Sequence, residues 1–368
     1  MDYLQERIAT LHDLTDPTPD APLSQSAVVV PIAGEQSDDV TPEQVFEALE
    51  TVGPKAVVVP LRAPREVVTL FEDWVEQFDL SVTVLWCNAD SVERVLTRNG
   101  LGGDSGKGRD VWLGLGIAAD RAEYVAVHDA DATTYDRHHV PRLLAPLAQD
   151  YSFVKGYYAR VEGGRLYGRL VRLLVVPLLT ALAEQDDKLL DYLSAFRYPL
   201  AGEFALTATA ARQVRAQRTW GLEIGLLGEA YAVAGRDGSA QVDLGVHRHD
   251  HRPVDGSGGL STMADDVAKA LFRVLADHDI DPEYAQLREK YQKSADKLIE
   301  QYAADSSFNG LAYDRQRERE QVQTYASSIQ PPARDDRLPP WENIDMSPSA
   351  VTAASRSALA GTGTPLTD

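Results

Sequence analysis

The strongest constraint on the fold is the alternation of short β-branched runs with amphipathic stretches in the first half of the chain. Runs rich in Val and Ile are typical of buried strands, and apolar residues three or four positions apart are typical of packed helices. Strands that alternate with helices form βαβ units, so the pattern predicts an α/β protein with a mainly parallel sheet flanked by helices. The predicted strands are 27–31, 56–60, 81–86 and 124–128, and the predicted helices between them are 42–52 and 65–78.

The second half of the chain is predicted to complete the sheet and to end in helices. A strand is expected over 153–160, a long helix over 165–184 and a strand over 242–246, with amphipathic helices near 262–276, 283–303 and 309–327. Beyond residue 328, Pro, Ser, Thr, Ala and Gly dominate and large apolar residues are few, which predicts disorder. The expected division is a polar segment 1–24 with at most one short helix, a first α/β half 25–150, a second half 151–260, a helical extension 261–327 and a disordered tail 328–368.

Composition narrows the class of protein. A formal net charge of −20 over 368 residues argues against a nucleic-acid partner, which would need a basic face, and it is a feature that halophilic proteins use. The chain has no run of 18 or more apolar residues, so no membrane-spanning helix is expected. The single cysteine, Cys87, excludes an internal disulfide framework. A cytoplasmic enzyme is the simplest interpretation.

Two carboxylates follow the fourth predicted strand at its carboxyl end. Asp129 and Asp131 are separated by Ala130, and ligands of parallel sheets collect at this edge. Carboxylate oxygens there suit Mg²⁺ or Mn²⁺ carrying a diphosphate, although ordinary loop acids remain the alternative. A second copy of the pattern, 277–281, follows a helical repeat and is interpreted as a solvated helix end.

Two further segments carry chemistry. Residues 102–110 form a glycine-rich loop with Lys107 before an apolar helix, where a lysine adds charge towards a phosphate. The spacing is not that of a P-loop, and a flexible surface turn is the alternative. Glu223 is an isolated acid in an apolar run, so it is either functional or salt-bridged to a neighbour.

Three histidines follow the strand predicted at 242–246. If the extended conformation continues, His247, His249 and His251 point the same way and can ligate a metal held by Asp131 or contact an anionic substrate. Histidines at a strand edge that are simply solvated are the alternative.

Taken in order, these segments resemble the retaining GT-A glycosyltransferases that make glucosyl-3-phosphoglycerate or mannosyl-3-phosphoglycerate. PLAGEF, GLEIGLL and QVDLGVHRHDHRP, between 199 and 253, are similar to that family's PLSGEY, GVEIGLL and QVNLGVRAHRNRP. The GKG loop, the paired aspartates and KGYYAR, which resembles KSFYRR, precede them in the family's order. The resemblance covers about Val28 to Leu275 and implies a Rossmann-like GT-A fold, with a helical C-terminal extension in this chain.

The resemblance also implies a role for individual residues. The nucleotide sugar would contact Pro31, Ile32, Glu35, Arg62, Lys107, Asp129, Ala130 and Asp131. The metal, Mg²⁺ or Mn²⁺, would be held by Asp131 and His249. The reacting centre would be formed by Asp131, the Leu200 carbonyl and Glu223. The phosphorylated acceptor would contact Gly168, Arg169, Val171 and His251.

The chain departs from the family pattern mainly at the acceptor site. Val171 replaces a threonine and removes a hydroxyl donor, and His251 replaces an asparagine. Retaining transfer of a hexose to 3-phosphoglycerate by a homodimer is what the resemblance implies. UDP-glucose and GDP-mannose both remain open as donors. The alternatives are a family-2-like transferase acting on a polysaccharide or lipid, and a catalytically silent nucleotide-sugar-binding protein.

Overall fold

A nine-stranded sheet forms the centre of the computed structural model, which describes residues 5–34, 41–185, 187–248, 259–332 and 334–361. The strand order is β1-β11-β7-β10-β6-β2-β4-β3, and β5 also pairs with β4. β10 is antiparallel to both of its neighbours, whereas the remaining pairs are parallel. The strands are β1 (Ala9–Leu11), β2 (Ser26–Val29), β3 (Ile32–Ala33), β4 (Ala56–Arg62), β5 (Val82–Trp86), β6 (Tyr124–Val127), β7 (Phe153–Ala159), β10 (Phe204–Thr207) and β11 (Ser239–Val246).

Helices cover both faces of the sheet, as an α/β pattern predicts. Side chains of a strand alternate between faces, so Val57 and Val59 of β4 pack in one core while Val58 packs in the other. The first core is closed by α1 (Glu43–Val52), α2 (Arg65–Val75) and α5 (His139–Leu144). The second is closed by α4 (Lys107–Arg121), α8 (Ala208–Gln213) and α9 (Leu222–Val233). The mainly parallel sheet predicted from the sequence is confirmed.

The amino-terminal segment contributes an edge strand, which the sequence did not indicate. β1 pairs in parallel with β11, and Ala9 lies opposite Ala240. Ile8, beside this strand, is buried in the core. Since at most a short helix was expected in this segment, the prediction is wrong here, and backbone pairing with a distant strand is the reason.

The long helix expected over 165–184 is confirmed from residue 169 onwards, but it begins four residues later than predicted. The segment begins with a hairpin of β8 (Val161–Glu162) and β9 (Arg165–Leu166), and Gly163 and Gly164 at its turn both have positive φ. A π-helical turn follows over Val171–Val175, and α6 (Val176–Leu182) starts with Pro177 in its first turn. The glycines at the hairpin turn explain the later start, and the helical backbone continues through the π-helical turn and Pro177 to Leu182.

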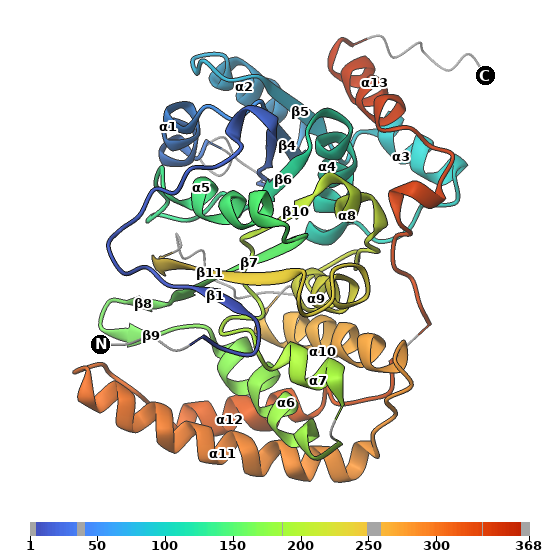
Figure 1. Cartoon of the computed structure of the whole chain (residues 1–368). Helices are drawn as coiled ribbons and strands as arrows, with labels where there is room; N and C mark the ends of the chain where they lie inside the picture. Colours follow the sequence, from blue (N-terminus) through green and yellow to red (C-terminus); the bar gives the residue numbers. More distant parts are fainter. Residues whose placement is uncertain (1–4, 35–40, 186, 249–258, 333, 362–368) are drawn as a thin grey trace.

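Three helices form a separate layer below the sheet in Figure 1: α10 (Leu260–Ala276), α11 (Tyr284–Phe308) and α12 (Arg315–Ala326). They confirm the predicted helical extension. α10 ends before Asp277, so the second D-x-D pattern lies at a helix end as expected. Asp277 is ion-paired rather than simply solvated, at 2.9 Å from Arg215 and 2.8 Å from Arg337.

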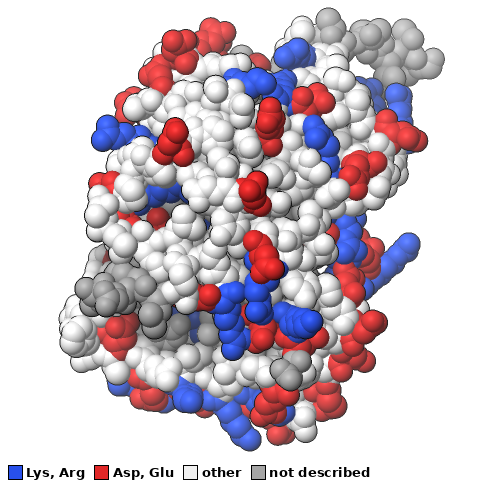
Figure 2. Space-filling model, in the orientation of Figure 1, with Lys and Arg blue, Asp and Glu red and all other residues white. Residues whose placement is uncertain are grey.

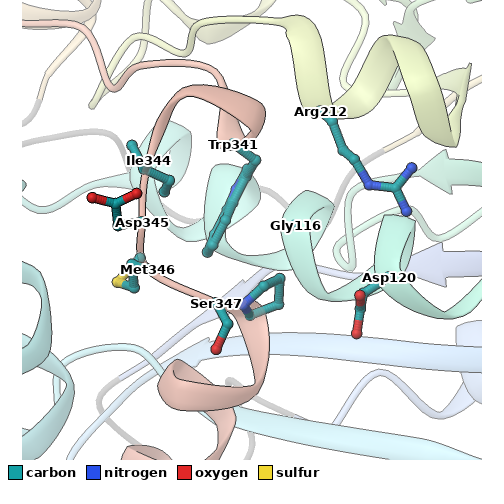
Figure 3. Close-up of a pocket in the computed structure, with 9 residues that line it drawn as sticks. Gly116, Asp120, Arg212, Trp341, Ile344, Asp345, Met346 and Ser347 are labelled. Atoms are coloured by element: carbon teal, nitrogen blue, oxygen red, sulfur yellow. The ribbon is translucent and has the colours of Figure 1, made fainter.

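The predicted disorder beyond residue 328 is wrong for the residues that the structure describes there. α13 (Pro348–Leu359) packs on α3 (Asp90–Arg98), and Trp341 stacks on Trp112 with ring centroids 4.4 Å apart. The Trp341 indole donates to the Trp112 carbonyl at 2.8 Å. Trp341 also lines a cavity of about 290 Å³ against Gly116 and Arg212, on the outer side of α4 (Figure 3). A few large side chains such as Trp341 pack this segment against the rest of the protein, so its low average hydrophobicity did not mean disorder.

We expect Trp341→Ala to lower the free energy of unfolding by about 3–5 kcal/mol, because it removes a buried ring and its hydrogen bond. Only 6% of the Trp341 surface is exposed. Urea unfolding would measure the change, with Phe308→Ala, whose ring is 91% exposed, as the matched control. A loss below about 1 kcal/mol would mean that this segment is not part of the cooperative core.

Acidic and basic side chains are interspersed on the face shown in Figure 2. Within the described ranges, no helix is long and apolar enough to cross a membrane.

Candidate active site

The antiparallel strand β10 carries a loop to the carboxyl edge of its parallel neighbours. Phe204 lies opposite both Val127 of β6 and Lys155 of β7, so the residues before Phe204 reach the edge where β6 ends. A Cβ atom on Gly202 would lie only 2.3 Å from the Asp129 carboxylate. Only glycine permits this approach. Leu200 of the same loop therefore belongs to the edge that carries Asp129.

Lys107 joins two of the predicted site residues. It is the first residue of α4, and its Nζ atom lies 2.7 Å from Asp129 Oδ1 and 2.8 Å from Glu223 Oε1. Glu223 is in the first turn of α9 and only 6% exposed. The structure thus brings together three side chains from the glycine-rich loop, the end of β6 and the start of α9. We call Lys107, Asp129 and Glu223 the lysine-centred cluster.

The two carboxylates keep Lys107 protonated. Burial lowers the pKa of Lys107, but the charges and hydrogen bonds of Asp129 and Glu223 outweigh it and raise the pKa above its usual value. The cluster therefore carries one positive and two negative charges. Of the two alternatives for Glu223, the structure shows the salt bridge. Residues 102–105 of the glycine-rich loop are exposed, whereas its end is anchored, since the backbone N–H of Arg109 donates to the Arg218 carbonyl at 3.0 Å.

Arg62 lies at the end of β4, next to the start of α4. Its Nε atom donates to Asp110 Oδ2 at 2.8 Å. Burial raises the pKa of Asp110, although Arg62 lowers it. Ile32 of β3 pairs with Leu61, so Pro31 and Ile32 lie on the same edge of the sheet as Arg62. Glu35, predicted with them, lies outside the described residues.

Asp131 is exposed on the loop that follows β6. This loop is tied to the end of β11, because the Thr133 N–H donates to the Arg248 carbonyl at 2.8 Å and the Arg248 N–H donates to Thr134 Oγ1 at 3.1 Å. His249, the predicted second ligand, follows Arg248 in sequence, but His249 and His251 lie outside the described residues.

The donor set fits a hard divalent cation. An exposed carboxylate at the sheet edge is an oxygen ligand of the kind that Mg²⁺ and Mn²⁺ prefer, and a diphosphate would complete the coordination. No group of three His, Cys, Asp or Glu side chains suited to a metal occurs in the part of the chain that the structure describes. Asp131 is thus an exposed carboxylate at this edge that could contribute one oxygen ligand.

Three polar side chains whose burial the sequence did not reveal, Lys155, Glu203 and His247, lie behind the 200–203 loop. Lys155 is 1% exposed, and its Nζ atom donates to the Ala201 carbonyl at 2.6 Å. Glu203 is fully buried, with Oε1 at 3.6 Å from His247 Nε2. His247 stacks on Tyr158 at 4.2 Å between ring centroids. His247 is therefore a buried residue and not an exposed histidine at a strand edge.

We expect catalytic efficiency to fall as the pH rises through about 8. Burial lowers the pKa of Lys155 to about 8, although Glu223 and Glu203 raise it. Deprotonation removes a positive charge beside these carboxylates, so an anionic donor binds less well. Because the unfolded lysine titrates near 10.5, the free energy of unfolding should rise between the two values. A pH profile of kcat/KM would measure the expected fall. The control is Lys155→Met, whose profile should show no fall near pH 8. A wild-type profile that stays flat to about pH 9.5 would contradict the prediction.

The predicted acceptor residues lie after the β8–β9 hairpin. Arg169 Nε is 3.9 Å from Glu318 Oε1, and Gly168 has a φ of +77°. Val171 is 4% exposed and packs in the core, so its side chain contributes no surface for a ligand. Arg160, which was not among the predicted residues, lies near Tyr198 in the same region, and although burial lowers its pKa, the Tyr198 hydroxyl raises it.

The mainly parallel sheet flanked by helices is a GT-A-like fold. A crystal structure of glucosyl-3-phosphoglycerate synthase from Mycobacterium tuberculosis in complex with phosphoglyceric acid aligns with a TM-score of 0.56 and 23% identity, over 76% of this chain and 90% of that one. A complex of the same enzyme with Mn²⁺, UDP and glucosyl-3-phosphoglycerate aligns with a TM-score of 0.55. At this level of identity, the likeness concerns the fold. No protein-family model matches the chain.

Two curated relatives place the chain more closely. It is 34% identical to glucosyl-3-phosphoglycerate synthase of Methanococcoides burtonii, over 92% of this chain and 91% of the relative. It is 38% identical to the enzyme of that name from Persephonella marina, over 73% of this chain and 70% of the relative. The chain belongs to the glucosyl-3-phosphoglycerate synthase family and is a hexosyltransferase.

Proposed function

We propose that the chain transfers glucose from UDP-glucose to 3-phosphoglycerate with retention, in a reaction that depends on a divalent metal. The observation that carries the proposal is the lysine-centred cluster beside the 200–203 loop, at the carboxyl edge of the sheet. The relative from Methanococcoides burtonii, which this chain matches over 91% of that relative's length, is named for synthesis of glucosyl-3-phosphoglycerate. Solved structures with the same fold are described as complexes with Mn²⁺, UDP-glucose and phosphoglyceric acid.

The donor would lie across this edge. Pro31, Ile32 and Arg62 would line the nucleotide, Asp129 and Ala130 would face the ribose, and Lys107 would approach the diphosphate. Asp131 with His249 would hold Mg²⁺ or Mn²⁺. When bound, the metal supplies Lewis-acid stabilisation of the negative charge on the leaving diphosphate.

Glu223 would orient the sugar or the acceptor through hydrogen bonds. Its carboxylate is bonded to Lys107, as is that of Asp129, which makes both of them weak nucleophiles. This favours same-face attack: the acceptor oxygen bonds to the anomeric carbon as the bond to the diphosphate breaks, and the acceptor's proton goes to the leaving phosphate. The Leu200 carbonyl would lie next to the reacting centre, and Arg169 would bind the acceptor phosphate.

The test is release of the nucleotide diphosphate in high salt with Mg²⁺, using a panel of nucleotide sugars with and without 3-phosphoglycerate. Release from UDP-glucose that requires 3-phosphoglycerate would support the donor and the acceptor together. Release that requires GDP-mannose would change the donor. Binding of a donor with neither transfer nor hydrolysis would favour a catalytically silent binding protein, and release with a polysaccharide or lipid acceptor would favour a family-2-like activity.

Three expectations from the sequence remain predictions. They are the cytoplasmic location, the homodimer and the adaptation to high salt. Size-exclusion chromatography in high salt would measure the oligomeric state, and the dependence of activity on salt concentration would test the third.

A further inference from the structure

Three arginines surround the π-helical turn, and they differ in how their charge is balanced. Arg172 is neutralised, because its two terminal nitrogens lie 2.8 and 3.1 Å from the carboxylate oxygens of Glu318. Arg169 approaches the same carboxylate only to 3.9 Å. Arg160, among the residues that the structure describes, has no carboxylate within 4.0 Å of its guanidinium. Arg169 and Arg160 are therefore less closely paired with the described carboxylates than Arg172 is.

Arg160 occupies the side of this region nearest the metal carboxylate. It follows directly after β7, and its backbone carbonyl accepts from the Tyr167 N–H at 2.9 Å, which closes the base of the hairpin. Burial lowers the pKa of Arg160, but the nearby Tyr198 hydroxyl and, more weakly, the Asp131 carboxylate raise it, which places its guanidinium close to both of them. Arg160 thus stands between the loop that carries Asp131 and the acceptor residues.

Tyr198 connects Arg160 to the predicted phosphate site. A Cβ atom on Gly168 would lie 2.8 Å from the Tyr198 hydroxyl, so this glycine, with its positive φ, is in direct contact with it. The Tyr198 ring packs on Tyr158 with centroids 4.7 Å apart. Arg160, Tyr198, Gly168 and Arg169 therefore form one continuous surface, with a guanidinium group towards each end.

The covalent structure of the acceptor indicates which guanidinium group binds which of its two acidic groups. 3-Phosphoglycerate has one free hydroxyl, on the carbon bonded directly to the carboxylate, whereas its phosphate is one carbon further away. Attack by this hydroxyl occurs beside the metal and the leaving diphosphate. The carboxylate is therefore the acidic group closer to the attacking oxygen, and a guanidinium near Asp131 is better placed to bind it than one further away.

We propose that Arg160 binds the carboxylate of the acceptor, while Arg169 binds its phosphate. The inference rests on the proposed function and deepens it. It makes Arg160 a residue that selects acceptors with a carboxylate next to the attacking hydroxyl. The guanidinium fork matches a carboxylate with two parallel hydrogen bonds, and such a contact favours acceptors that carry the group.

The test compares 3-phosphoglycerate with glycerol 3-phosphate, which lacks the carboxylate. For Arg160→Gln, we expect the KM for 3-phosphoglycerate to rise roughly 10- to 100-fold, the loss of one charged hydrogen-bonded contact. The inhibition constant of glycerol 3-phosphate should change by less than about threefold, since the variant removes nothing that this compound uses. Arg160→Lys should give an intermediate KM. Arg165→Gln, at an exposed position of the same hairpin, is the control and should leave both constants unchanged.

The outcomes separate the two proposals. If wild-type protein shows no release dependent on 3-phosphoglycerate, the proposed function fails, and the inference fails with it. If wild-type protein is active but both constants rise together in Arg160→Gln, or neither does, then Arg160 does not read the carboxylate, and only the inference is overturned. An unchanged inhibition constant for glycerol 3-phosphate would also show that the variant retains a folded site.

Discussion

Asp131→Asn should lower kcat by about 1,000-fold, with almost no effect on stability. The substitution keeps the shape of the side chain but removes the charge that would hold the metal, and groups that stabilise developing charge typically contribute effects of this size. Asp131 is exposed, so the free energy of unfolding should change by less than about 0.5 kcal/mol. Steady-state assays over a range of Mn²⁺ concentrations, together with urea unfolding, would measure both.

The chain offers a matched control in its second D-x-D pattern. Asp281 is exposed between α10 and α11. Asp281→Asn makes the same chemical change in a segment that contributes no strand to the sheet. It should leave kcat and the dependence on Mn²⁺ unchanged. Retention of more than about a tenth of wild-type kcat in Asp131→Asn, at every Mn²⁺ concentration, would remove Asp131 from the metal site.

The lysine-centred cluster could be predicted from the sequence because each member stands out locally. Lys107 follows glycines before an apolar helix, Asp129 ends an apolar strand, and Glu223 interrupts an apolar run. Their convergence follows from a general property of parallel sheets, whose carboxyl edge gathers the loops. No precise geometry was needed for this part of the site.

The burial of the Lys155, Glu203 and His247 side chains could not be predicted in the same way. Lys155 and Glu203 meet only because β10 is inserted antiparallel between β6 and β7. That choice depends on pairing between distant segments, and a short strand such as Phe204–Thr207 carries no sign of its direction. The inserted strand also explains how Gly202 comes to touch Asp129.

The carboxyl-terminal segment was missed for a different reason. Disorder was predicted from average composition, but packing depends on a few side chains in the right place. Leu338 and Trp341 are both buried, and Leu338 exchanges backbone hydrogen bonds with Ala216 at 2.9 and 3.1 Å. Arg218, two residues on from Ala216, donates to the Asp336 carbonyl and accepts from the Arg109 N–H. The segment therefore supports the start of α4, where Lys107 lies.

Lys107→Met should lower kcat/KM for the donor by roughly 100- to 1,000-fold, because it removes the one positive charge of the cluster and leaves the diphosphate facing two carboxylates. Without Lys107, the Asp129 and Glu223 carboxylates lose the cation that each contacts within 3 Å. Removing one partner of a largely buried pair also destabilises the fold, here by about 1–3 kcal/mol after allowance for partial exposure of Lys107 and Asp129. Steady-state assays with UDP-glucose as the varied substrate, together with urea unfolding, would measure the two effects.

A triple variant separates the catalytic from the structural part of this effect. In Lys107→Met with Asp129→Asn and Glu223→Gln, no buried charge is left unpaired, so much of the lost stability should return. Activity should not return, because the cation that approaches the diphosphate is still absent. Lys107→Arg, which keeps the charge but not its point geometry, should fall between wild type and Lys107→Met. If the triple variant recovered activity along with stability, Lys107 would be a structural partner of the two acids, and the diphosphate would have to be neutralised by the metal and Arg62 instead.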